Sequence, residues 1–175
     1  MHIPTISRRT LTLALGAFLS CSLVAAQKPD EGIAKARAAW ENSFNSKDLP
    51  GLMSLYADDA ALLATSGERI VGKDKIAAYF KALFDSSSTL HVKLNSETTA
   101  SASDLGYDSG TYEEVVTHAG GTTISGNVVV SGNVQISGGG ESREISNGSY
   151  LFVLTRKAGK WLFTQQAWTI HAQPK

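Results

Sequence analysis

The sequence predicts an α+β domain in which a curved antiparallel sheet wraps around three N-terminal helices. Three observations predict this class. Apolar residues recur at helical spacing up to residue 86, and from residue 90 their spacing changes to two, which is typical of strands with one buried face. The helices precede the strands rather than alternate with them. The sheet must roll over the helices, because their apolar stripes and one face of the strands need covering.

The first 26 residues are predicted to be an export signal. Arg8 and Arg9 supply its positive charge, residues 11–24 form a short apolar stretch, and Val24-Ala25-Ala26 fits a cleavage site. The pattern around the two arginines resembles a twin-arginine signal, with ordinary Sec export as the alternative. The apolar stretch is too short to favour an uncleaved anchor. We therefore expect a periplasmic or secreted protein consisting of residues 27–175.

Composition narrows the possible partners. The signal holds two of the sixteen basic residues and no acidic one, so the mature chain has 14 basic and 16 acidic residues. Nucleic acids and anionic membranes need clustered positive charge, so neither is expected as a partner after cleavage. Cys21 is the only cysteine and lies within the signal, so the cleaved chain has no cysteine and no disulfide. The alternative is that Cys21 belongs to a poor lipoprotein box and carries lipid.

Three helices are predicted before the sheet. The first begins after Asp30, a helix-capping residue, and its apolar positions fall on one stripe: Ile33, Ala36, Trp40 and Phe44. Asp48 can cap a second helix with Pro50 in its first turn, and its inward stripe is Leu49, Leu52, Met53 and Tyr56. Residues 60–64 predict a short buried strand, and Gly72 precedes a third helix over residues 73–86.

Four longer strands follow. Their predicted ranges are 90–103, 107–118, 149–156 and 161–171, and residues 157–160 form a strong hairpin signal between the last two. Asn147-Gly148 predicts a turn before the third of these strands.

Residues 119–148 differ from the rest in being rich in Gly, Ser, Thr, Asn and Val. Similar hexapeptides start at Ile124, Val130 and Ile136. We favour a long hairpin insert that turns near residues 131–133, with a loose loop or a small β-solenoid as alternatives. A solenoid would need at least about three full repeats to bury a core.

Several short motifs occur in a characteristic order. They are Asn45-Ser46-Lys47-Asp48-Leu49, Leu55 to Ala60, Gly72 to Ile76, Gly106 to Tyr112, and Gly159-Lys160-Trp161 followed by Trp168. In this order the chain resembles the nuclear-transport-factor-2-like superfamily, and within it the SnoaL-like and ketosteroid-isomerase-like bacterial domains, many of unknown function. The resemblance implies a cone-shaped, cystatin-like α+β fold, an apolar cavity at its open end, and usually a homodimer through the sheet. It implies no single activity.

The isomerase chemistry of these relatives does not carry over. That reaction needs a carboxylate base, a tyrosine and a neutral carboxylic acid. The corresponding positions here are Ala64, Trp40 and Leu151. We therefore expect no ketosteroid isomerisation. Relatives also often carry an acidic residue at the position of Gln166, and its amide further weakens an acid–base interpretation.

Five residues are candidates for binding a ligand in the cavity: Trp40, Tyr56, Tyr112, Gln166 and Trp168. The aromatic ones could equally be ordinary core residues. Strand parity places Tyr112 and Glu114 on one face. If that face looks inward, Glu114 is the best catalytic candidate, a base whose pKa is raised by burial. The alternatives are an exposed strand carboxylate, or Glu113 on the opposite face.

Other chemistry finds little support. His91, His118 and His171 form no metal-ligand pattern, and Gly67 to Asp74 only nearly matches a phosphate-binding loop. We expect no metal and no cofactor. The leading hypothesis is an exported domain that binds a small apolar molecule. The alternatives are a cofactor-free lyase or isomerase using Glu114 or Tyr112, and a protein-interaction module acting through residues 119–148.

Overall fold

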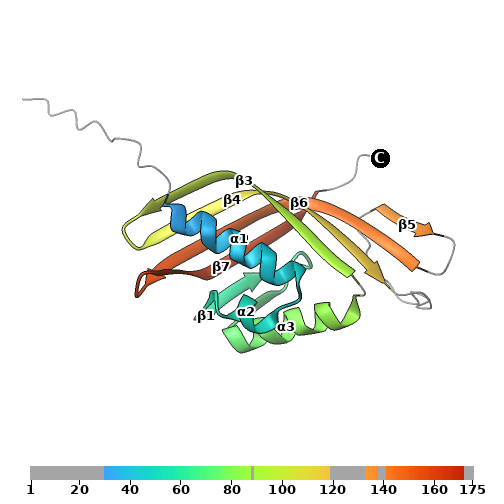
Figure 1. The fold of residues 1–175 in the computed structure, drawn as a ribbon, viewed down its shortest axis with the longest axis horizontal. Helices are drawn as coiled ribbons and strands as arrows, with labels where there is room; N and C mark the ends of the chain where they lie inside the picture. The colour runs from blue at the N-terminus through green and yellow to red at the C-terminus, as the bar shows by residue number, and fades with distance from the viewer. Residues whose placement is uncertain (1–29, 88, 119–132, 138–140, 172–175) are drawn as a thin grey trace, which may run out of the picture.

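The computed structural model describes residues 30–87, 89–118, 133–137 and 141–171. They form three helices and a seven-stranded sheet, so the predicted α+β class is confirmed (Figure 1). The elements in chain order are α1 (Glu31–Asn45), α2 (Leu49–Met53), β1 (Tyr56–Leu63), β2 (Arg69–Val71), α3 (Lys73–Ser86), β3 (Thr89–Ala102), β4 (Leu105–His118), β5 (Asn133–Ser137), β6 (Glu141–Lys157) and β7 (Lys160–Ile170). Among the helices described, none has the length and apolar character needed to cross a bilayer.

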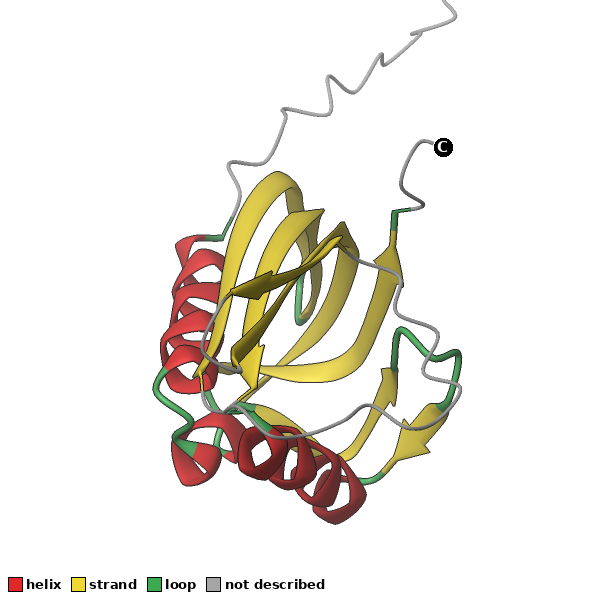
Figure 2. Cartoon of the chain, turned by 90° about the vertical axis from the view of Figure 1, so that its right-hand side faces the viewer, coloured by secondary structure: helices red, strands yellow, loops and turns green. Residues whose placement is uncertain are grey.

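The sheet has the strand order β2-β1-β7-β6-β4-β3, with β5 paired to β6. Only β1 and β7 run parallel; the other neighbours are antiparallel. Figure 2 shows the sheet curling strongly, with the helices along its side and beneath it. The concave face and the helices enclose one apolar core.

Two glycines permit this curvature. A Cβ on Gly110 would lie 2.0 Å from the carbonyl oxygen of Asn95, and one on Gly148 would lie 1.7 Å from that of Thr169. Neither position has room for a side chain, because the neighbouring strand approaches too closely. The turn predicted at Asn147-Gly148 is therefore wrong: both residues lie within β6, where glycine serves close approach rather than a turn.

The helices form where predicted, and local capping explains why. The Asp30 carboxylate accepts a hydrogen bond from the Gly32 amide at 2.7 Å, and Asp48 accepts one from Gly51 at 3.0 Å. These side chains satisfy amides that have no partner within the helix. Gly72 precedes α3 with φ of 97°, as expected for a residue that breaks the chain before a helix.

The first strand differs from its prediction. Tyr56 opens β1 instead of continuing the inward stripe of α2, because the Leu55 carbonyl accepts from the Phe163 amide at 2.8 Å and draws the chain into the sheet. Leu63, expected in a buried strand, is 42% exposed. The three-residue strand β2 was not predicted, since so short a segment has no readable period.

The insert also differs from its prediction. Of residues 119–148, the structure describes β5 and the first part of β6, which pair from Asn133↔Ile145 to Ser137↔Glu141. β5 and β6 are therefore antiparallel neighbours, whereas the turn predicted near residues 131–133 falls largely outside the described residues. Residues 141–148 belong to the main sheet, because β6 pairs with β4 as far as His118↔Ser142. Residues 119–132, and the export signal at 1–26, lie outside the described residues.

Side chains of α1 cover part of the edge strand β3. The Asn45 amide group donates to the Val92 carbonyl at 2.9 Å and accepts from the Val92 amide at 2.7 Å. Two residues further along β3, the Glu41 carboxylate accepts a hydrogen bond from the Leu94 amide at 3.0 Å. The helix thus satisfies backbone groups that an edge strand otherwise leaves open.

Candidate functional site

A cavity of about 140 Å³ lies between α1, α3 and the concave face of the sheet. Most of its wall is aromatic or aliphatic, and among the described residues Glu114 is the one carboxylic acid in that wall, which contains no Lys, Arg or His. Thr65, an exposed residue just after β1, belongs to the lining. The lining residues are Trp40, Phe44, Leu62, Ala64, Thr65, Tyr79, Phe80, Leu83, Val92, Tyr112, Glu114 and Trp168.

The aromatic side chains form a continuous cluster. Trp40 stacks on Phe44 of the next helical turn at a centroid distance of 4.9 Å and contacts Trp168 of β7 at 5.2 Å. Tyr112 meets Trp168 edge to face at 5.1 Å. Such ring pairs stabilise the packing by more than the area that they bury, so we expect this wall to be rigid.

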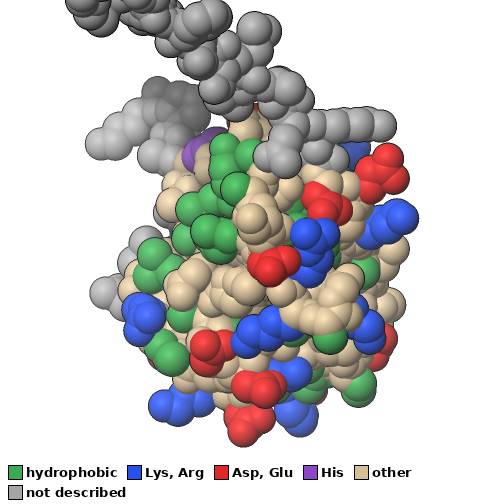
Figure 3. Space-filling view, turned by 90° about the vertical axis from the view of Figure 1, so that its left-hand side faces the viewer, with side chains coloured by type: hydrophobic (Ala, Val, Ile, Leu, Met, Phe, Trp, Pro, Cys, Tyr) green, Lys and Arg blue, Asp and Glu red, His purple; other side chains and the backbone are tan. Residues whose placement is uncertain are grey.

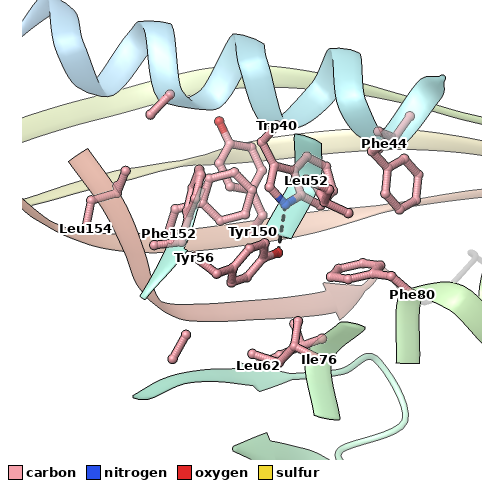
Figure 4. Packing of buried hydrophobic residues seen from close by; sticks show 14 of the residues in the cluster. Trp40, Phe44, Leu52, Tyr56, Leu62, Ile76, Phe80, Tyr150, Phe152 and Leu154 are labelled. Atoms are coloured by element: carbon pink, nitrogen blue, oxygen red, sulfur yellow. Dashed lines mark hydrogen bonds between the residues drawn. The ribbon is translucent and has the colours of Figure 1, made fainter. Parts of the chain in front are cut away.

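The orientation of Trp40 is fixed from within the core (Figure 4). Its indole Nε1 donates to the Tyr56 hydroxyl at 2.8 Å, and that hydroxyl donates to Gln166 Oε1 at 2.5 Å. Burial raises the pKa of Tyr56, so its phenol keeps its proton and both bonds. Tyr56 and Gln166 do not line the cavity. They hold Trp40, which does. Gln166 Nε2 has no partner among the described residues.

Glu114 projects from β4 toward the cavity, as the predicted parity requires, whereas Glu113 is exposed on the opposite face. The Ser146 hydroxyl donates to Glu114 Oε2 at 3.3 Å. Burial raises the pKa of Glu114 above its ordinary value of 4.5, the charge of Glu144 raises it further, and the bond from Ser146 opposes both. Glu114 is therefore a carboxylate held at the cavity at a cost in desolvation.

Tyr112 has a hydroxyl that is buried and lacks a hydrogen-bond partner in the described chain. Burial, and then the nearby charge of Glu114, raise the pKa of Tyr112, so its hydroxyl stays protonated. A buried hydroxyl without a partner is costly and calls for an explanation. It is the polar group in the cavity wall that a ligand could satisfy.

The structure brings four of the six candidate residues together at the cavity: Trp40, Tyr112, Trp168 and Glu114. The positions corresponding to the isomerase machinery do not converge in the same way. Ala64 and Trp40 line the cavity, but Leu151 is 42% exposed, whereas its neighbour Tyr150 is buried. Within the described residues, no three His, Cys, Asp or Glu side chains gather as metal ligands. His91 and His171 are exposed, and the side chain of His118 is not described.

Sequence reasoning missed a second polar cluster deeper in the core. Asp108 is fully buried and pairs with Arg37 Nη1 at 2.7 Å. It also accepts from the hydroxyls of Ser96 at 2.8 Å, Thr99 at 2.6 Å and Tyr150 at 2.6 Å. The signal was present, because Asp108 shares the inward parity of Tyr112 and Glu114. All of the bonds are internal to the cluster, so its role is structural.

Comparisons with known proteins agree with this architecture. The sequence model of the SnoaL-like domain matches residues 36–163. A search of curated proteins finds no match.

Solved structures with the same fold include a ketosteroid isomerase-like protein from Erwinia carotovora atroseptica (18% identity, TM-score 0.62, covering 82% of this chain and 96% of that one). Others are a type 2 hexachlorocyclohexane dehydrochlorinase (13%, 0.62, 81% and 84%) and an NTF2-like protein of unknown function from Pseudomonas putida KT2440 (15%, 0.56, 79% and 84%). Because the family model spans most of the described domain, the chain belongs to the SnoaL-like family of the nuclear-transport-factor-2-like superfamily.

Proposed function

We propose that this protein binds a small, mostly apolar molecule of about one ring in the cavity between α1, α3 and the sheet. The observation that carries the proposal is a largely apolar cavity whose wall contains a buried hydroxyl, that of Tyr112, which has no partner among the residues described. An engineered apolar cavity of about 150 Å³ accepts benzene, and this one measures about 140 Å³. A fused multi-ring ligand would exceed it, since pockets for drug-sized molecules start at about 300 Å³.

A plug at the rim of the cavity tests this proposal. Thr65 is exposed and lines the cavity, so Thr65→Trp should block entry with little effect on folding. The probe is benzyl alcohol, and isothermal titration calorimetry measures its binding to the full chain. Ser66→Trp is the matched control, because Ser66 is exposed and does not belong to the lining. We expect binding to wild type and Ser66→Trp and its loss in Thr65→Trp; equal binding by all three would refute the site.

A second candidate function is a cofactor-free lyase or isomerase in which Glu114 carries the proton. The position of this carboxylate in the cavity and the upward direction of its pKa favour this candidate. The fold is shared with a protein named as a dehydrochlorinase, which supports an elimination without establishing one here. With any substrate found, Glu114→Gln should abolish turnover and leave binding intact; unchanged turnover would exclude Glu114 as the proton carrier.

We also propose that the chain pairs with a second copy through the outer face of the sheet. Leu63, Ala167 and Leu151 are register neighbours across β1, β7 and β6, and both leucines are exposed. The expected test is sedimentation velocity of wild type against Leu151→Lys, with Ala82→Lys, at an exposed position of α3, as the control away from the sheet. A wild-type monomer would end the proposal. Export, and recognition of a partner by residues 119–148, stay predictions.

On the end of the molecule seen in Figure 3, basic and acidic side chains are interspersed. No large patch of one sign is visible on that face. This face therefore offers no cluster of positive charge of the kind that nucleic acid and anionic membranes require.

A further inference from the structure

The cavity has an unbalanced charge. Glu114 lines it, and none of the described lining residues is Lys, Arg or His. The one hydrogen bond that Glu114 receives within the described chain comes from a neutral hydroxyl, that of Ser146, at 3.3 Å. Buried carboxylates are normally paired with a cation or a metal. Glu114 has no such partner among the residues that the structure describes.

The surroundings of Glu114 add to its negative potential. Glu144 on β6 repels it, and Tyr79 on α3 and Tyr112 on β4 both experience its charge. Glu68, just before β2, acts on Tyr79 as well. Six of the twelve lining residues are aromatic, and the faces of aromatic rings carry partial negative charge. Each of these contributions attracts a cation and repels an anion.

We propose that the ligand of this cavity is a small organic cation, an ammonium group attached to about one ring. The ring lies against the aromatic wall formed by Trp40, Phe44 and Trp168. The ammonium group donates one N–H to the Glu114 carboxylate and another to the oxygen of the Tyr112 hydroxyl, which has no partner within the described chain. Aromatic walls with a carboxylate are how proteins recognise ammonium ligands, because the cation–π and ionic attractions add.

This inference rests on the proposed function, which is that the cavity binds a ring-sized molecule. It adds that this molecule carries a positive charge. Three probes of nearly equal shape separate the two statements: benzylamine, which is a cation at about pH 8, benzyl alcohol, which is neutral, and benzoate, which is an anion. Their affinities for the full chain are measured by calorimetry. We expect benzylamine to bind about tenfold more tightly than benzyl alcohol, and benzoate to bind most weakly.

Two variants assign the preference to the cavity. Glu114→Gln keeps the shape and removes the charge, so benzylamine and benzyl alcohol should then bind within about threefold of each other. Glu113→Gln removes a carboxylate from the outer face of the same strand and should leave the tenfold preference intact. Circular dichroism confirms that both variants fold.

Each outcome decides one statement. If benzyl alcohol binds and benzylamine binds no more tightly, the cation is ruled out and the ring-sized site stands. A preference that survives Glu114→Gln would also overturn the inference, because it would come from charge elsewhere. If no probe binds to wild type, the proposed function itself fails.

Discussion

Replacing Asp108 by alanine should destabilise the protein more than any other single loss of a carboxylate in the described chain. Asp108 is the fully buried member of an ion pair with Arg37 and accepts from three hydroxyls as well. Asp108→Ala leaves four donors without their acceptor, among them a guanidinium group that is only 23% exposed.

The expected cost follows from this geometry. Breaking a buried ion pair by removing one partner costs about 3–5 kcal/mol, because the remaining charge and donors stay desolvated. The whole domain is stabilised by about 5–15 kcal/mol. At about 2–4 °C per kcal/mol for a chain of this size, the melting temperature should fall by about 6–20 °C.

Urea denaturation of the full chain, followed by tryptophan fluorescence, measures the change at constant m-value. Asp58→Ala is the control, because Asp58 is 98% exposed and its contact with Lys73 is 3.6 Å long; its cost should stay within about 0.5 kcal/mol. The double variant Arg37→Met/Asp108→Leu should recover part of the loss, since it removes the unpaired guanidinium but leaves the three hydroxyls without their acceptor. A cost below about 1 kcal/mol for Asp108→Ala would refute this account of the cluster.

Three further variants test other features. Glu114→Gln should raise the free energy of unfolding at neutral pH. Because the pKa of Glu114 is raised in the folded state, that state binds more protons than the unfolded state above about pH 4.5. The contribution of Glu114 to wild-type stability therefore falls as the pH rises from there, and the variant lacks this loss. Gly148→Ala should cost about 3 kcal/mol or prevent folding, because its Cβ would overlap the Thr169 carbonyl. Asn45→Ala should cost about 1–3 kcal/mol by removing both bonds to Val92, and should promote aggregation.

Matched variants accompany these measurements. The control for the pH profile is Glu113→Gln, on the exposed face of the same strand as Glu114, which should leave the profile unchanged. For the glycine it is Gly159→Asn, at a hairpin position with φ of 78° and open space, which should cost about 1 kcal/mol or less. For the edge it is Asn42→Ala, exposed on the same helix. Parallel pH profiles for wild type and Glu114→Gln, or equal costs within either of the other pairs, would contradict the corresponding prediction.

The helices could be predicted from sequence because their signals are local. The Asp30 and Asp48 caps and the apolar stripes set the limits of α1 and α2, and Gly72 marks the start of α3. Strand limits depended on distant partners. Tyr56 entered β1 because of an amide on β7, and β6 extended to Glu141 because β4 and β5 pair with it there. Neither partner can be read from the neighbouring residues.

The cavity was predictable to a similar degree. Strand parity and helical spacing placed Trp40, Tyr112 and Glu114 on its wall. They could not separate residues that line the cavity from residues that hold the lining residues in place, since Gln166 and Tyr56 also point inward. Asp108 had the right parity, but its burial depended on meeting Arg37, a pairing across 71 positions of sequence.

The contacts between α1 and β3 limit how copies of this protein can join. β3 is the last strand at its end of the sheet, and Asn45 and Glu41 already occupy hydrogen-bonding groups of Val92 and Leu94. A strand from another molecule cannot dock alongside this segment without first displacing the helix. The sheet is thereby prevented from templating open-ended fibrils at this segment.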